Sequence, residues 1–150
     1  MKKLILLFFF ASFFAGARAQ FKITNTSTIN IAELRGDSDP WPCDLQRVVK
    51  SSDTMYILSF RDKQSTNSVN MSTLKFGNLE QLRYFQKGLT ALKNGSDGDQ
   101  ADFKGYSIKR TDVREAKKVK VKYVLTCSEG DLTDLQQGEA DKLIAAIKSL

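Results

Sequence analysis

The sequence predicts an α+β domain in which two helices pack on one face of an antiparallel sheet of four to five strands. Several short stretches alternate apolar and polar side chains, as half-buried strands do. Two longer stretches repeat apolar residues at helical spacing, and clusters of Gly, Asn and Asp separate the elements. The 150 residues, of which 41% are hydrophobic and 27% charged, are typical of one folded domain and not of a disordered chain.

Residues 1–19 have the three-part pattern of a secretory signal peptide. Lys2 and Lys3 give a positive start, an apolar run of about 11 residues follows, and Ala17-Arg18-Ala19 provides the small residues of a cleavage site. The run is shorter than the roughly 20 residues of a membrane span, although an uncleaved anchor is the alternative. No Cys follows the run, so a lipoprotein is not expected. We expect cleavage, one domain over 20–150, and a secreted or periplasmic bacterial protein.

Export changes how Cys43 and Cys127 are interpreted. In an oxidising compartment, two Cys residues most simply form one disulfide. They lie 84 positions apart, and a bridge closing such a loop stabilises a fold by about 4–5 kcal/mol on chain-entropy grounds. The alternatives are two thiols or a bridge to another chain. A catalytic thiol is not expected, because the chain has no His to activate it.

The first half of the domain contains mostly strand patterns. Residues 20–32 alternate β-branched and polar side chains, which predicts one strand or a broken pair. Residues 36–44 predict a loop, because two prolines there prevent regular pairing. Residues 55–60 and 69–76 predict the two strands of a hairpin.

A helix is predicted directly after this hairpin. Asn78 can cap its first turn, with Gln81 at capping-box spacing, and Asn94-Gly95 is a typical C-terminal stop. One apolar stripe runs along it, formed by Leu79, Leu82, Phe85, Leu89 and Leu92.

The second half repeats this order. Residues 103–111 predict a strand, 112–117 a charged turn, and 118–125 the clearest strand of the chain. Gly130-Asp131 ends that strand, and Thr133 with Gln136 has the capping-box spacing of a second helix. Its apolar stripe consists of Leu135, Ala140, Leu143, Ile147 and Leu150.

The predicted order of strand, strand, helix occurs twice, which raises the hypothesis of a tandem ββα repeat with halves at about 53–94 and 103–150. Both predicted helix starts share the signature Gly-[Asn/Asp]-Leu-x-x-Leu, at residues 77–82 and 130–135. The alternative is that any strand-to-helix junction recruits Gly, a capping residue and Leu.

The composition excludes several classes of function. With no His and 2 Cys, the chain cannot build a His-dependent triad, a His-ligated metal site or a four-Cys zinc site. No nucleophile-elbow, SxxK or phosphate-loop motif occurs. We therefore expect a protein that is not an enzyme and has no cofactor and no metal site.

The positive charge is concentrated in one region. The 23 basic and 17 acidic side chains give a formal charge of +6, and loss of residues 1–19, with three basic side chains and no acidic one, would leave +3. Alternation in the strand at 118–125 places Lys118, Lys120 and Lys122 on one face. Lys109 is expected to join that face from the neighbouring strand.

Such a face is suited to an acidic partner, and the alternative is an ordinary solvated face that protects a sheet edge. Nucleic acid is not an expected partner, because the protein is expected to be exported and no row of stacking aromatic residues accompanies the lysines. Trp41, in the proline-flanked loop, is the second candidate for binding, and its alternative role is to cover the core beside Cys43.

Together these features predict a small exported binding or accessory module with no membrane span after cleavage of the signal. The expected partner is an acidic protein or an anionic envelope glycan. One alternative is a self-associating structural component of the cell envelope. The other is a hydrolase that uses carboxylates, the remaining route to catalysis without His.

Overall fold

The fold was analysed in a computed structural model that describes residues 25–35, 43–63, 70–116 and 118–150. The predicted signal peptide, Trp41 and most of the predicted 36–44 loop lie outside these residues.

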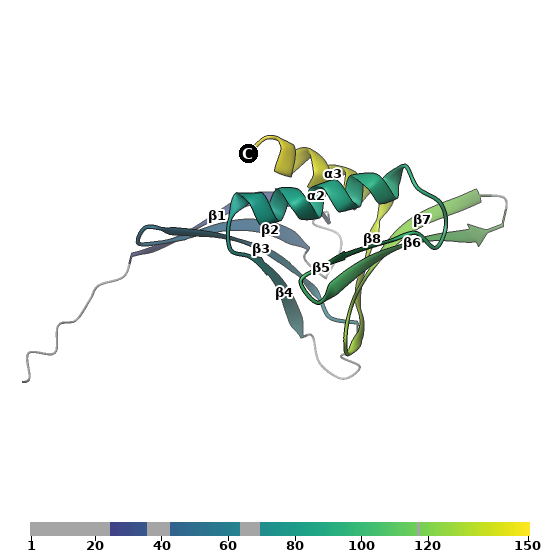
Figure 1. The fold of residues 1–150 in the computed structure, drawn as a ribbon, viewed down its shortest axis with the longest axis horizontal. Helices are drawn as coiled ribbons and strands as arrows, with labels where there is room; N and C mark the ends of the chain where they lie inside the picture. Colours follow the sequence, from purple (N-terminus) through teal and green to yellow (C-terminus); the bar gives the residue numbers. More distant parts are fainter. Residues whose placement is uncertain (1–24, 36–42, 64–69, 117) are drawn as a thin grey trace, which may run out of the picture.

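The first half consists of four strands followed by a helix (Figure 1). The strands pair in chain order as an antiparallel sheet, β1-β2-β3-β4. The elements are β1 (Thr26–Glu33), β2 (Asp44–Lys50), β3 (Asp53–Arg61), β4 (Met71–Phe76) and α2 (Leu79–Lys93).

The second half has the same element order, with a second antiparallel sheet, β5-β6-β7-β8, followed by a helix. Its elements are β5 (Gln100–Phe103), β6 (Tyr106–Glu115), β7 (Lys118–Cys127), β8 (Gly130–Gln136) and α3 (Gln137–Lys148).

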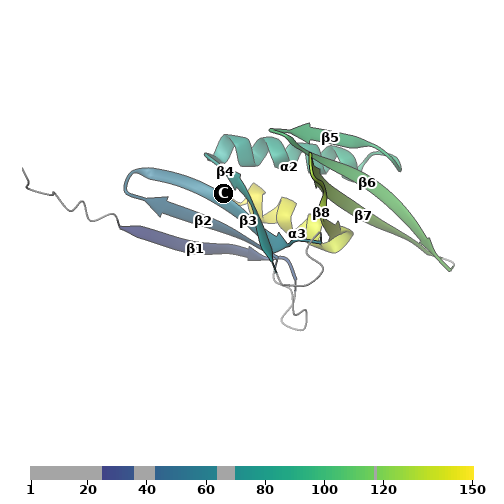
Figure 2. The same cartoon turned by 90° about the horizontal axis from the view of Figure 1, so that it is seen from below.

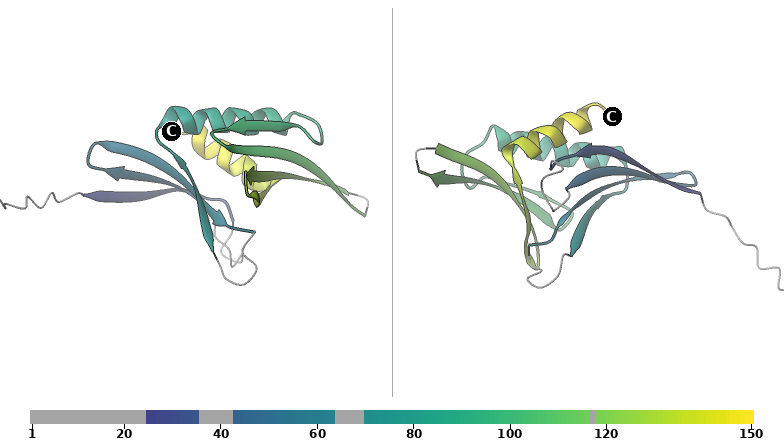
Figure 3. Two further views of the ribbon diagram at one scale, coloured as in Figure 1. Left: turned by 60° about the horizontal axis from the view of Figure 1, so that its bottom comes forward. Right: turned by 180° about the vertical axis from the view of Figure 1, so that it is seen from behind.

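The two sheets diverge from one another as a V, and the helices lie across its open side (Figures 1 and 3). Helix α2 contacts β3 and β4 of the first sheet and β5 and β6 of the second, whereas α3 contacts β1, β7 and β8. The inner faces of both sheets therefore pack on helices around one apolar cluster. Its largest fully buried members include Leu58, Phe60, Phe85, Tyr123 and Leu125.

The α+β class, the antiparallel pairing and the two helices are confirmed. The strands form two sheets of four instead of one sheet of four to five, because the predictions missed β2, β5 and β8. Strand β2 has apolar residues only at Leu45, Val48 and Val49, so its sequence does not alternate.

The start of the second helix was predicted too early. Residues 130–136 are strand β8, in which Leu132, Thr133 and Leu135 are buried, and the helix begins at Gln137. The capping box pairs Gln136 with Glu139, whose Oε2 accepts a hydrogen bond from the Gln136 amide at 2.7 Å. Strand β8 continues to the start of the helix, because Gln136 still pairs with Lys122 of β7.

The tandem ββα repeat is not confirmed. Four strands precede each helix, and the signature shared by residues 77–82 and 130–135 lies on a helix start in one case and on strand β8 in the other. At the first helix the predicted cap is present, because Asn78 Oδ1 accepts from the Gln81 amide at 2.9 Å. The Gln81 side chain accepts in turn from the Gly77 amide, also at 2.9 Å.

The predicted Cys43–Cys127 disulfide is absent from the structure. Cys43 lies just before β2 in the first sheet and is buried, whereas Cys127 ends β7 in the second sheet and pairs with Gly130. The two cysteines therefore belong to different sheets and are not bonded to each other in the structure.

Candidate functional site

The predicted lysines share the outer face of the second sheet. In an antiparallel pair, directly opposed residues point to the same side. Lys120 of β7 is opposite Val113 of β6, and Lys109 is opposite Val124, which lies two residues along the strand from Lys122. Lys109, Lys118, Lys120 and Lys122 therefore form one lysine face, opposite the buried Tyr123 and Leu125.

The outer part of the β6–β7 hairpin projects beyond the rest of its sheet. Strand β5 pairs with β6 as far as Lys109, and β8 pairs with β7 as far as Lys122. Residues 113–115 and 118–120, called the ribbon below, pair only with each other within the described part of the chain. Figure 2, seen from below, shows this hairpin end running past β5 and β8.

The ribbon exposes side chains on both of its faces. Val119, which points to the inner side of the sheet, is 58% exposed because neither helix reaches that far. Two-stranded ribbons are only marginally stable on their own in water, and an unpaired strand edge is a template for pairing with another chain. The ribbon therefore has free surface on both faces and at its edges.

One ion pair forms on the lysine face. Lys120 Nζ contacts Glu115 Oε2, and both side chains are about half exposed. The hydrogen bond from Lys120 lowers the pKa of Glu115, and the charges of Lys120 and Lys122 lower it further. In the described residues, Lys109, Lys118 and Lys122 have no ion-pair partner. The face thus retains a net positive charge.

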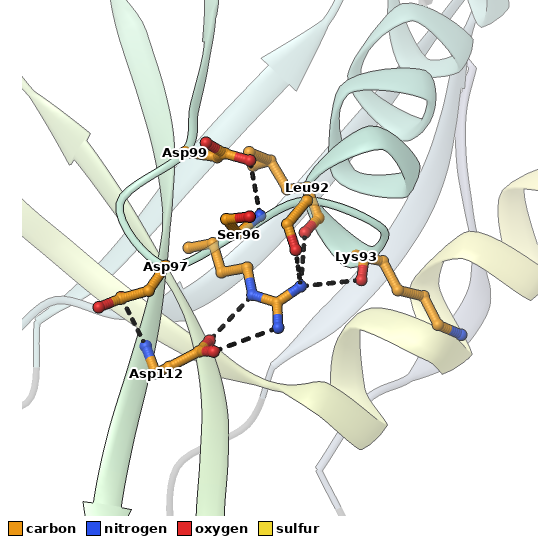
Figure 4. Close-up of polar contacts among 8 residues, drawn as sticks. Leu92, Lys93, Ser96, Asp97, Asp99 and Asp112 are labelled. Carbon is orange, nitrogen blue, oxygen red and sulfur yellow. Dashed lines mark hydrogen bonds and ion pairs between the residues drawn. The ribbon is translucent and has the colours of Figure 1, made fainter.

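A set of hydrogen bonds around Arg110, called the arginine cluster below, connects the base of the hairpin to helix α2 (Figure 4). Arg110 of β6 donates to the carbonyls of Leu92, Lys93 and Gly95 at 3.2, 3.0 and 2.7 Å, at the C-terminal end of α2. The carbonyls of Leu92 and Lys93 belong to the last turn of the helix, where carbonyl groups lack intrahelical donors. Arg110 also forms an ion pair with Asp112 at 2.9 Å, and the hydrogen bond that it donates to Asp112 raises the pKa of Arg110.

The acidic loop that joins α2 to β5, residues 94–99, is held by the same cluster. Asp99 Oδ2 accepts from the Ser96 amide at 2.6 Å, and Asp97 Oδ1 accepts from the Asp112 amide at 2.9 Å (Figure 4). These acidic side chains accept backbone hydrogen bonds. The described residues contain no group of three or more potential metal ligands.

A second region was not anticipated from the sequence. A surface hollow of about 550 Å³ lies between the start of α2 and the β5–β6 turn, with Tyr84 and Lys104 in its wall. Aromatic and cationic residues from three elements meet there. The signal in the sequence was weak, because Tyr84 and Lys87 read simply as the polar face of an amphipathic helix.

Comparison with known proteins provides no assignment. No protein-family model matches the chain, and no curated protein matches it significantly in sequence. Among solved structures, SsgB of Streptomyces coelicolor is similar over 85% of this chain and 86% of its own, with 12% identity and a TM-score of 0.33. A likeness of that degree carries no argument about this protein.

Proposed function

We propose that this protein is an exported, non-enzymatic binding module that holds an acidic partner on its lysine face. The observation that carries the proposal is the projecting ribbon, where strands with no further neighbour present lysines to solvent. The partner is an acidic protein surface or an anionic envelope glycan. Export rests on the signal pattern of residues 1–19. No helix in the described residues is long and apolar enough to cross a membrane.

The clustered charge of the lysine face favours binding over catalysis. Clustered like charges attract an oppositely charged partner and speed its association, and the effect weakens as salt increases. Within the described residues, the three lysines without an ion-pair partner lie on one face, so an acidic partner can contact them together. The exposed Val119 adds apolar contact area beside them.

The test is binding of the purified protein to two probes, poly-glutamate and polygalacturonate, over a range of salt concentrations. The variant replaces Lys118, Lys120 and Lys122 with Gln. A matched control replaces Lys50, Lys75 and Lys148 with Gln. These lysines are exposed elsewhere on the protein, so the control loses the same net charge.

We expect the first variant to weaken binding by about tenfold or more and to flatten the salt dependence, since each exposed charge pair contributes a factor of about two to five. The control should change binding less than about twofold, through net charge alone. Equal losses in the two variants, or binding that is independent of salt, would contradict the proposal. Preference for one probe would identify the partner as acidic polypeptide or glycan.

Self-association is the second candidate, favoured by the edges of the ribbon and by Val119. Sedimentation at several protein concentrations separates the two candidates. A monomer at all concentrations excludes self-association. A dimer that the replacement Val119→Lys dissociates would favour the structural role over the binding role.

A further inference from the structure

The hollow beside α2, called the α2–β5 groove below, is separate from the lysine face. One wall is the helix surface at Arg83, Tyr84 and Lys87, and the other is the end of the β5–β6 hairpin at Phe103 and Lys104. Its volume of about 550 Å³ is within the usual range for small-molecule sites. The hollow adjoins a second one of about 280 Å³ along the helix, which shares Tyr84, Lys87 and Phe103.

Aromatic rings line the groove. Phe76 and Phe103 both pack on the buried ring of Phe85, with ring centroids 5.2 and 4.9 Å away. Tyr84 is 64% exposed although it stands in the groove wall. Gly88 lies close to β5, since a Cβ on it would be 3.3 Å from the Ala101 Cβ, so the helix is held tightly against the strand. The groove is therefore a fixed feature of the packing between these elements.

The charges around the groove are unbalanced. Three cations, Arg83, Lys87 and Lys104, line it with one acid, Glu80. In the part of the chain that the structure describes, none of the three cations has an ion-pair partner. Cations held around an apolar surface without counter-charges are complementary to an anion with an apolar body.

Lys104 occupies a backbone position that lysine disfavours. It has φ 43° and Gly105 has φ 81°, and these two residues form the tight turn between β5 and β6. Such two-residue turns favour Asn, Asp or Gly at the first position, because other side chains are strained at positive φ. Ser51 and Ala116 also have positive φ, so the strain alone assigns no role, but the turn places Lys104 in the lining of the groove.

We propose that the α2–β5 groove binds a small amphipathic anion, in which an aromatic or apolar body lies on Tyr84 and Phe103 and an acidic group meets Arg83, Lys87 and Lys104. The apolar body gains by leaving water, and the acidic group gains charge-assisted hydrogen bonds. This site is independent of the partner proposed for the lysine face.

The experiment compares two fluorescent probes that differ in one charged group. 1-Anilinonaphthalene-8-sulfonate carries a sulfonate, and N-phenyl-1-naphthylamine is its uncharged counterpart. We expect the sulfonate probe to bind the purified, folded protein at one site and about tenfold more tightly than the neutral probe. Several charge-assisted contacts, each contributing a factor of about two to five, produce that difference.

Three variants identify the site. Lys104→Asn should weaken binding of the sulfonate probe by about two- to fivefold. The thermal midpoint of this variant should be equal to or higher than that of wild type, because Asn suits the turn better. Lys87→Gln should weaken the sulfonate probe by a similar factor and leave the neutral probe unchanged. Tyr84→Ala should weaken binding of both probes by about fivefold or more, because the groove loses an aromatic ring that both probes contact.

The matched controls lie outside the groove. Lys75→Gln removes an exposed lysine of β4, and Ile29→Ala truncates a side chain of β1 that is 44% exposed. Neither should change either affinity by more than about twofold. Equal binding of the two probes, no binding of the sulfonate probe, or losses in the controls as large as in the groove variants would each overturn the proposal. The lysine-face variant should bind the sulfonate probe like wild type, so the two proposals fail separately.

Discussion

The base of the β6–β7 hairpin and its tip, which is the ribbon, belong to one ladder of paired residues, but their surroundings differ. At the base, Ile108 pairs with Leu125 between β5 and β8, and both side chains are about 1% exposed. At the tip, Arg114 pairs with Val119, which is 58% exposed. Both ends have the same antiparallel backbone pairing, so they differ in whether other elements cover their side chains. Burial stabilises the base, whereas the tip offers its surface to another molecule.

The largest expected effect tests this contrast through stability. Leu125→Ala removes fully buried apolar atoms at the base and should lower the free energy of unfolding by about 2–5 kcal/mol. Val119→Ala at the tip should change it by no more than about 0.5 kcal/mol. Urea denaturation followed by circular dichroism measures both values. Similar losses in the two variants would show that the tip is as well packed as the base.

The arginine cluster should contribute the next largest effect. Arg110→Met keeps much of the apolar stem but leaves the carbonyls of Leu92 and Gly95 without this donor. We expect a smaller loss of stability than for Leu125→Ala, with the greatest rise in amide exchange across residues 95–99. If exchange rises uniformly over the protein instead, the cluster does not act locally on that loop.

The buried Tyr123, at the base of the hairpin, gives the stability of the protein a dependence on pH. Burial raises the pKa of Tyr123, which is 1% exposed, above its usual value near 10. The unfolded chain therefore loses the tyrosine proton first as pH rises, so the stability from this group is present below about pH 10 and is lost above it.

Tyr123→Phe should therefore lose less stability than wild type between about pH 9 and 11. Tyr84→Phe, at an exposed tyrosine, is the matched control and should follow wild type. Urea midpoints measured across this range provide the comparison. The interpretation fails if Tyr123→Phe and wild type have parallel pH profiles.

The smallest effect is expected at the ion pair of the tip. Lys120→Gln should bring the pKa of Glu115 up toward its ordinary value, because the main cause of the lowered pKa is removed. The thermal midpoint should not move measurably, since exposed ion pairs contribute little. A carboxyl titration by nuclear magnetic resonance reports the pKa directly. A clear drop in the midpoint would mean that the pair stabilises the fold.

The sequence was informative where one periodicity dominated. Alternation from Lys118 to Leu125 predicted the strand and its lysine face, and Asn78 with the stripe from Leu79 to Leu92 predicted the first helix. Strand β8 was missed because its sequence does not alternate regularly. The adjacent residues Leu132 and Thr133 are both buried, and the pairing of β7 with β8 shifts register near Thr126.

The binding geometry depends on contacts between distant elements, which local patterns do not encode. Nothing near Val119 in the sequence indicates that β5 and β8 end before it. The α2–β5 groove likewise arises because Tyr84 and Phe103, 19 positions apart, come from elements that pack against each other. The proposed roles of Lys109 and Trp41 stay predictions, and Trp41 lies outside the described residues.

Amide hydrogen exchange along β6 and β7, with and without poly-glutamate, tests the central claim most directly. We expect the amides of Ile108 and Leu125 to be among the most protected and unchanged by the probe. The ribbon amides, residues 113–115 and 118–120, should exchange much faster and become protected when poly-glutamate is added. A ribbon that is already as protected as the base, or protection that arises elsewhere on the molecule, would contradict the account.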